Sequence, residues 1–282
     1  MTASAIRAEW FKVMRRPSVW VTVGLLLALS IGLEYLLVYI VATHPPRGTA
    51  ATGATLANLR TDLYPASAIR KTLSNMSGLY GIFALIIGVL FQGSEYSWGT
   101  IKTAHLQLPG RITIVAGQLV TLAVVALVMA LSLFAVDAAS SFAIALFDQH
   151  ATTWPAAQDV IKGIGAAWLI LYFLAVFGFG LATAFRGSAL AIGLGLAYAL
   201  VIENLVFGLL VNLGDTFKQI QEWLPIANAT YLQQSFGAVR AAAAASAGSP
   251  PVDGTHAAVV LTLWLVAIVV VSAGLVRTRD VT

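Results

Sequence analysis

Two acidic side chains lie inside long apolar runs of the sequence and are the first candidates for chemistry. Glu34 falls in the run 19–41 and Glu203 falls in the run 187–211. An acid at the centre of a membrane span costs about 2.5–3.5 kcal/mol on insertion scales, so such a residue is by default a functional candidate. No basic residue lies in any of the apolar runs to pair with them. We therefore expect Glu34 and Glu203 either to line a substrate path or to be protonated, hydrogen-bonded groups that specify packing.

Small residues surround one of these acids on the helix that the sequence predicts. Ala191, Gly195 and Ala199 precede Glu203 at four-residue spacing. A stripe of small residues lets two helices approach closely. This spacing predicts that Glu203 faces protein and not lipid. A third acid, Asp137, interrupts an apolar run that continues to Phe147, and we interpret it as a residue at the boundary of a span.

The sequence lacks the motifs of several catalytic and nucleotide-binding classes. It has no GxxxxGK[ST] phosphate loop, no HExxH and no GxSxG. It has no cysteine, and its four histidines are far apart in the chain, so a metal cluster is not expected. The net charge of +4 is explained by membrane topology and predicts no nucleic-acid partner. We expect a protein that is not an enzyme, binds no cofactor itself and takes any ATP-derived energy from a partner.

Segment 94–111 separates two apolar runs and carries residues suited to protein docking. Pro109-Gly110 is a turn signal near its end. An exposed helix that combines an aromatic residue with both signs of charge suits contact with a soluble protein. The candidate contact residues are Glu95, Trp98, Gly99, Thr100, Lys102 and Arg111.

The N-terminal segment 6–16 has the spacing of an amphipathic helix. One predicted face is mostly apolar and includes Trp10; the other carries Glu9, Lys12, Arg15 and Arg16, and Pro17 ends the helix. Such a helix lies at the membrane interface with its basic face toward anionic lipid. It serves either as a topology anchor alone or also as a contact for a cytoplasmic partner. The residues assigned to this interfacial helix are Trp10, Lys12, Arg15 and Arg16.

These residues must be positioned by helices that cross a membrane. Only 10% of the 282 residues are charged and 59% are apolar, with a mean hydropathy of +0.86, whereas soluble domains carry about 25% charged residues. A helix needs roughly 20 apolar residues to span a bilayer. The sequence predicts a single all-α transmembrane domain over 1–282, with six spans at 19–41, 75–93, 112–136, 163–185, 187–211 and 257–276.

The basic residues predict the orientation. Six spans place both termini on one side, and the densest basic tract, Lys12 to Arg16, directly precedes the first span. Positive residues favour the cytoplasm, so the termini and segment 94–111 are expected inside and segment 212–256 outside. Within 212–256, the spacing of Phe217, Ile220 and Trp223 predicts an amphipathic helix at the outer interface. A low Lys to Arg ratio, 5 against 11, and abundant alanine are typical of a GC-rich bacterial genome, which favours a bacterial cell membrane.

Segment 94–111 resembles the Glu-x-x-x-Gly-Thr…Pro-x-Arg pattern of permease subunits in ATP-binding-cassette exporters of the type-2 class. It matches at Glu95, Gly99, Thr100, Pro109 and Arg111, and the opening Glu9-x-x-Lys12-x-x-Arg15-Arg16-Pro17 and the ending Arg279-Asp280 also look like that family. The resemblance implies a coupling helix within 95–108 and an interfacial connecting helix at 6–16. It also implies two permeases, identical or paralogous, assembled with two cytoplasmic ATPase subunits that bind ATP and magnesium. Such exporters carry amphiphiles such as drugs, lipids or peptides.

Two other functions stay open at this point. One is a secondary transporter that uses Glu34 or Glu203 as a proton or cation site. The other is a membrane-embedded enzyme or assembly factor, and the missing catalytic motifs argue against the enzyme.

Overall fold

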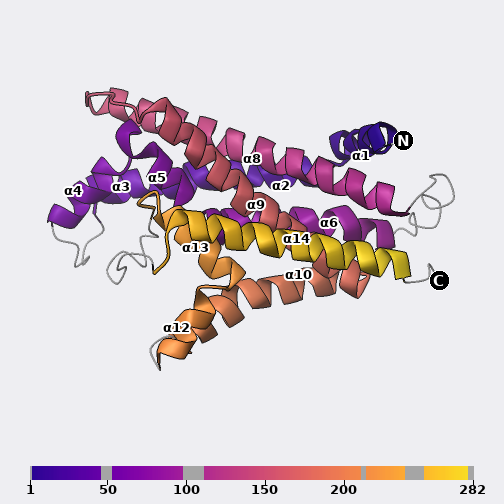
Figure 1. Ribbon diagram of the computed structural model, residues 1–282. Coiled ribbons are helices and arrows are strands. Elements are labelled where there is room, and N and C mark those ends of the chain that lie inside the picture. Colours follow the sequence, from indigo (N-terminus) through magenta and orange to yellow (C-terminus); the bar gives the residue numbers. More distant parts are fainter. Residues whose placement is uncertain (1, 46–52, 98–110, 211–213, 239–250, 279–282) are drawn as a thin grey trace.

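The computed structural model describes residues 2–45, 53–97, 111–210, 214–238 and 251–278, and it forms helices with no strand in these ranges (Figure 1). Five helices are long and apolar enough to cross a membrane: Pro17–Thr43, Met76–Tyr96, Ile112–Phe147, Ala157–Phe185 and Gly254–Thr278. The predicted all-α class and the multi-pass membrane character are thereby confirmed.

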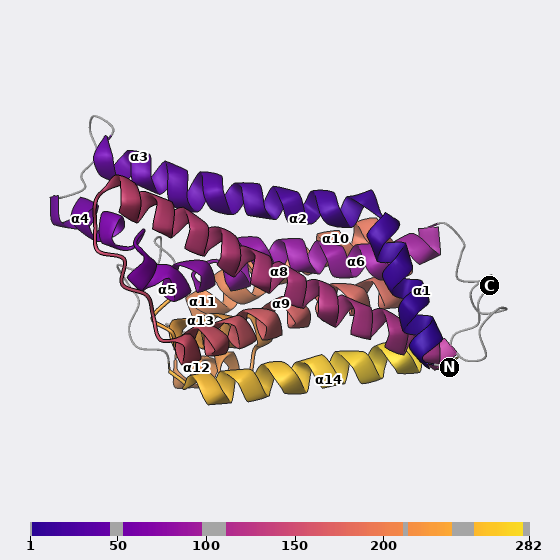
Figure 2. The same cartoon turned by 90° about the horizontal axis from the view of Figure 1, so that it is seen from above.

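The first span follows a short helix that lies across the end of the bundle (Figure 2). Helix α1 (Thr2–Arg15) stops at Arg16, whose extended backbone is the conformation that a following proline favours. Pro17 then begins α2 (Pro17–Leu29), which continues through the π-helix η1 (Ser30–Leu36) into α3 (Leu37–Thr43). The predicted stop at Pro17 is where the chain changes direction.

The second and third spans differ in regularity. The π-helix η3 (Met76–Tyr80) leads into α6 (Gly81–Ser97), and Gly78 inside η3 has non-helical dihedral angles that kink the chain. Helix α8 (Arg111–Phe147) runs without interruption past the predicted boundary of its span. Asp137 lies inside this helix and is fully buried, with Ser30 as its hydrogen-bond donor. Its interpretation as a residue at the membrane boundary stays a prediction, because a helix of 36 residues is longer than a bilayer requires.

The remaining helices complete the bundle. Helix α9 (Ala157–Phe185) is followed by α10 (Ser188–Leu196), the π-helix η4 (Ala197–Phe207) and α11 (Gly208–Leu210), and the last helix is α14 (Gly254–Thr278). The stretch from Ser188 to Leu210 extends from the end of the bundle that holds α1 to the end that holds α12 (Figure 1). It is not among the five long apolar helices, so the number of six spans stays a prediction.

Short helices gather at the opposite end from α1 (Figure 1). They are α4 (Gly53–Thr61), η2 (Pro65–Ser67), α5 (Ala68–Leu73), α12 (Asp215–Gln221) and α13 (Pro225–Gln234). Helix α13 is buried among α14, α9, η3 and η4. The sequence did not lead us to expect a buried helix in segment 212–256.

The core is centred on α9, which packs against α6, α8, α10 and α14. The α6 and α9 backbones touch at two glycines. A Cβ atom at Gly88 would lie 1.8 Å from the carbonyl oxygen of Ala175, and one at Gly178 would lie 2.2 Å from that of Leu85. Only glycine permits such an approach, which is a common device for packing helices in membranes.

Candidate functional site

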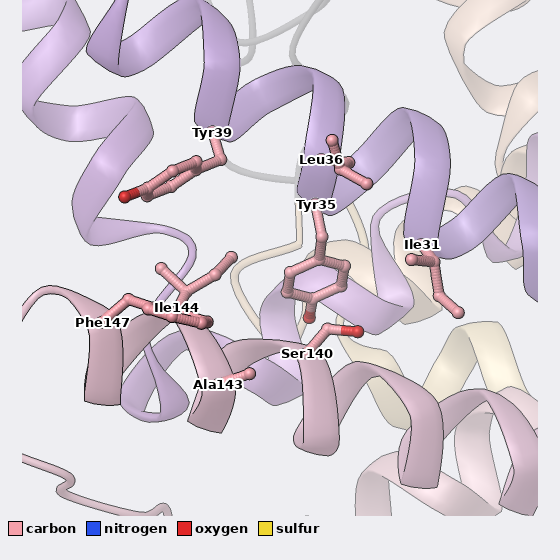
Figure 3. A pocket seen from close by; sticks show the side chains of 8 residues that line it. All are labelled: Ile31, Tyr35, Leu36, Tyr39, Ser140, Ala143, Ile144 and Phe147. Atoms are coloured by element: carbon pink, nitrogen blue, oxygen red, sulfur yellow. The ribbon is translucent and has the colours of Figure 1, made fainter.

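A groove opens between the first span and the distal part of α8 (Figure 3). Its volume is about 550 Å³. The polar groups of its lining are the hydroxyls of Tyr35, Tyr39 and Ser140. The rest of the lining is apolar: Ile31, Leu36, Ala143, Ile144 and Phe147. Leu36 and Phe147 are exposed at its edge. A groove of this size and polarity fits a hydrocarbon chain better than a polar solute.

A polar cluster caps the groove where α8 ends. Asp148 accepts hydrogen bonds from the Tyr39 hydroxyl at 3.2 Å and from the Tyr64 hydroxyl at 3.0 Å. Arg60 of α4 binds the same carboxylate through two nitrogens, at 3.0 and 2.7 Å. The Tyr64 ring also stacks on His150, with centroids 3.9 Å apart. Arg60 holds the pKa of Asp148 below its ordinary value, so this cluster is ionised at neutral pH.

A pair of buried acids lies beside the groove, on the same two helices. Asp137 precedes the groove residue Ser140 by one turn of α8, and Glu34 is next to Tyr35 in η1. Ser30 donates a hydrogen bond of 2.5 Å to one oxygen of Asp137. The Asn75 amide donates a hydrogen bond to one oxygen of Glu34. Glu34 is 5% exposed and Asp137 is 0% exposed, so the pair is shielded from solvent and lipid alike.

Several oxygen atoms in this region are buried without a hydrogen-bond partner among the described residues. They are Glu34 Oε2, Asp137 Oδ2 and the hydroxyl oxygens of Tyr35 and Tyr80. Buried polar groups are almost always satisfied, and each exception calls for an explanation. Figure 3 shows the Tyr35 side chain directed toward α8, with its hydroxyl near Ser140.

Two of the helices that carry these buried oxygens have an irregular backbone. Ser30, Glu34 and Tyr35 lie in the π-helix η1, and Tyr80 ends the kinked π-helix η3. Gln233 of α13 satisfies one backbone amide near the kink, because its side-chain oxygen accepts a hydrogen bond from the Ser77 N–H at 3.1 Å. Irregular backbone at membrane depth is tolerated where protein satisfies it or where it lines a cavity, and single π-turns are frequent at functional sites.

Glu203 has a different environment from Glu34. Its Oε1 accepts a hydrogen bond of 2.5 Å from the Ala227 amide, in the first turn of α13. The small residues Ala191, Gly195 and Ala199 on the same ladder are buried, as the prediction that Glu203 faces protein requires. A carboxylate at a helix N-terminus satisfies an otherwise unpaired amide and favours the helix dipole. This contact supports the packing role, while a place on a substrate path stays a prediction for Glu203.

A charged network joins α1 to the end of α6. Arg16 donates to Glu95 Oε1 at 2.6 Å, and Lys12 lies 3.4 Å from the same oxygen and 2.7 Å from Glu9. Glu95 and Glu9 are buried, and burial raises the pKa of Glu9. The expectation that Glu9 and Lys12 share a lipid-facing polar surface is wrong, because both turn toward α6. Glu95, which the sequence predicts in an exposed docking helix, is instead buried and paired with Arg16.

The other interfacial residues divide between the two sides of α1. Trp10 is half-buried beside Val13, whereas Arg15 is exposed over the exposed ring of Phe11, 4.4 Å from its centroid. Met14 is also exposed. Phe11 and Met14 would contact lipid if α1 lies in the membrane interface.

Most of the predicted coupling residues lie outside the described part of the chain: Trp98, Gly99, Thr100 and Lys102. Arg111 begins α8, but its side chain is also outside the description. The sequence did not lead us to expect five other residues at the site: Asp137, Tyr35, Tyr39, Arg60 and Asp148. Asp137 carried a usable signal, since the apolar run on both sides of it is long enough for one helix; the others gave none.

Comparison with known proteins gives a family but no activity. The model of a protein family described as "Protein of unknown function (DUF2705)" matches residues 56–282, most of the chain. No curated protein matches the sequence.

Proposed function

This chain belongs to the DUF2705 family of proteins of unknown function, and we propose that it is the membrane-spanning permease subunit of an ATP-binding-cassette exporter. In this proposal two cytoplasmic ATPase subunits bind ATP and magnesium and drive a pair of permeases, either two copies of this chain or one copy with a paralogue. The chain itself carries out no hydrolysis.

The observation that carries the proposal is the ion-paired junction between α1 and the last turn of α6. Arg16 and Lys12 meet Glu95 immediately before segment 98–110, which by resemblance contains the coupling helix. A movement imposed on that segment by a partner would therefore reach α1 and the first span through a partly buried salt bridge. Two elements that the resemblance assigns to the ATPase side are thus in direct contact.

The proposed topology has six spans with both termini in the cytoplasm. Helix α1 and the C-terminal end of α14 lie at the same end of the bundle (Figure 1). A sixth crossing by Ser188–Leu210 accounts for this arrangement. The positions of Arg16, Arg186 and Arg277, each at a helix end, agree with a cytoplasmic assignment for that side.

The proposed substrate is an amphiphile that enters or leaves through the groove between the first span and α8. Hydrocarbon would contact Ile31, Leu36 and Ile144. The charged cluster of Arg60 and Asp148 is located at the end of the groove, where a polar headgroup would lie. Glu34 remains a substrate-path candidate, because it adjoins the groove residue Tyr35.

A secondary transporter is the second candidate, and one observation favours it. Glu34 and Asp137 form a buried acid pair within the membrane-spanning region, which is the kind of site that ion-coupled transporters use. No described feature favours a membrane enzyme or an assembly factor.

Co-purification with an ABC ATPase, sought first in the neighbouring reading frames, tests the proposal. We expect the full chain to elute with that ATPase, and Trp98→Ala to weaken the association about 30-fold, as truncation of a central interface aromatic does. Wild-type association and transport in a well-expressed Trp98→Ala variant would exclude the coupling helix. Absence of any ATPase from the purified, active chain would favour the secondary transporter.

Glu95→Ala tests the junction separately from docking. We expect this variant to retain ATPase binding but to lose the coupling of hydrolysis to transport, because Arg16 loses its buried partner. Arg15→Ala is the matched control, since it removes a basic residue from the exposed side of the same helix. Equal coupling of hydrolysis to transport in the two variants would show that the ion-paired junction does not transmit movement from the ATPase.

A further inference from the structure

We propose that Glu34 and Asp137 form the centre of a binding site for a small monovalent metal cation, of which sodium is the type, enclosed by η1, η3 and α8. The site does not depend on ATP-driven export: it would exist equally in a secondary transporter. The cation would be coupled to transport or would fix the packing of the three helices.

The charges around the pair favour one positive charge. Glu34 lies about one turn from Ser30 in η1, and Ser30 donates a hydrogen bond to Asp137, so the two carboxyl groups are near each other. Lys71 of α5 is the basic side chain whose charge acts on both of them. Two negative charges and one positive charge leave one negative charge in a region shielded from water. A single monovalent cation would neutralise it, whereas a divalent ion would leave an excess positive charge, and uncompensated charge is costly in such surroundings.

Unpartnered oxygens supply the ligands. Each acid uses one oxygen in a hydrogen bond, with Asn75 or Ser30, and leaves the other without a partner in the described structure. Tyr80 is 0% exposed and lies close enough to both acids to feel their charge, yet its hydroxyl makes no well-formed hydrogen bond to any described residue. The two carboxylate oxygens and the two phenol oxygens each have free lone pairs that could bind a cation, and oxygen ligands suit hard cations.

The backbone beside the two acids departs from regular α-helix, as it does beside the sodium ions of many transporters. Broken helices in transporters place unwound carbonyl groups near sodium ions, and here η1 and η3 depart from α-helical geometry beside the two acids. The unpaired oxygens are enclosed, so the site suits a small ion and not an organic amine. Neither Glu34 nor Asp137 lines the amphiphile groove, although their neighbour Tyr35 does.

Thermal denaturation of the purified full chain in detergent tests the site. The comparison is between sodium chloride and choline chloride at equal ionic strength and fixed pH. We expect sodium to raise the melting temperature in a saturable manner by about 3 °C or more, as a ligand that binds only the folded state does. Glu34→Gln and Asp137→Asn should each abolish this response, whereas Glu203→Gln, an acid removed from a different buried site, should retain it.

A milder variant keeps the test decisive if the acid variants do not fold. Tyr80→Phe removes one oxygen with almost no change of shape, and it should raise the midpoint of the sodium titration about tenfold, a typical cost of altering the surroundings of a bound ion. Equal melting temperatures in sodium and choline across a pH series, with a response to pH alone, would overturn the proposal in favour of a proton site. A sodium response that survives in both acid variants would overturn it as well.

Discussion

At the scale of single residues, the sequence identified the buried acids, because charged residues are rare in apolar runs, but it did not identify their neighbours. Glu34 and Glu203 were candidates because charge is costly in hydrocarbon, and both are buried and hydrogen-bonded. Asp137 was interpreted only as a residue at the end of a span, and its burial against Ser30 was not expected. Its partner Ser30 is 107 residues away in sequence, and no local pattern announces such a contact.

Glu203 should stabilise α13 through its hydrogen bond and not through its charge alone. Glu203→Leu leaves the buried Ala227 amide without an acceptor, so we expect a loss of about 1–3 kcal/mol in the free energy of unfolding. Glu203→Gln keeps a carbonyl oxygen at the same place and should cost much less. Denaturation in detergent measures the difference, and hydrogen exchange over 225–234 shows whether it is local. Equal stability of the two variants would refute this role.

The Asp148 cluster should make stability depend on pH in acid. Because Arg60 and two phenols hold the folded-state pKa of Asp148 below its unfolded value, its contribution is present above the unfolded pKa of about 4 and is lost as the pH falls through the folded value. We expect the wild type to be more stable than Asp148→Asn by about 1 kcal/mol at neutral pH. Melting curves of the two proteins should converge toward pH 3, and a gap that persists there would contradict the assignment.

At the scale of elements, hydropathy located the spans because lipid imposes a length and a composition on each helix. It failed where burial comes from protein instead of lipid. Helix α13 is buried although its sequence is only moderately apolar, since Pro225 starts it and Asn228 and Gln233 make buried hydrogen bonds to neighbouring segments. The resemblance to exporter permeases cannot reveal the intramolecular pairing of Glu95 either, because a short motif records residue types and not contacts.

The contact between α6 and α9 should tolerate no side chain. Gly178→Ala would place a methyl group against the Leu85 carbonyl, so we expect a loss of about 1–3 kcal/mol in stability, as for other overpacked cores. Gly165→Ala lies on the same helix with open space around it and should be neutral or stabilising by up to about 1 kcal/mol. Yield of folded protein and melting temperature compare the two. Similar behaviour would mean that the helices can separate without cost.

At the scale of the whole molecule, the sequence predicted the all-helical, multi-pass character of the chain but not which helices pack against one another. Which helix occupies the centre depends on contacts between distant segments, and α9 has that place because glycines and alanines let others approach it. The groove likewise depends on two segments far apart in sequence, the first span and the end of α8, which together line it. Neither feature follows from the composition of any one run.

Single cysteines test the orientation, because the natural chain has none. Ala8 and Thr216 are exposed at opposite ends of the bundle. On intact cells, an impermeant thiol reagent should label Thr216→Cys and should label Ala8→Cys only after the membrane is opened. The reverse pattern would invert the topology and remove segment 98–110 from the side where an ATPase is found.

The glycine contacts between α6 and α9 also decide which parts of the molecule can move. Two helices whose backbones touch have no intervening side chains to repack, so neither can slide or rotate on the other without a collision. They form a stationary frame. If the chain alternates between two states, the displacement falls on the first span, most of whose surface is exposed and which faces α8 across a groove. Opening and closing of that groove would then be the main movement of the transport cycle, and the ion pair of Arg16 and Glu95 would lie at its pivot.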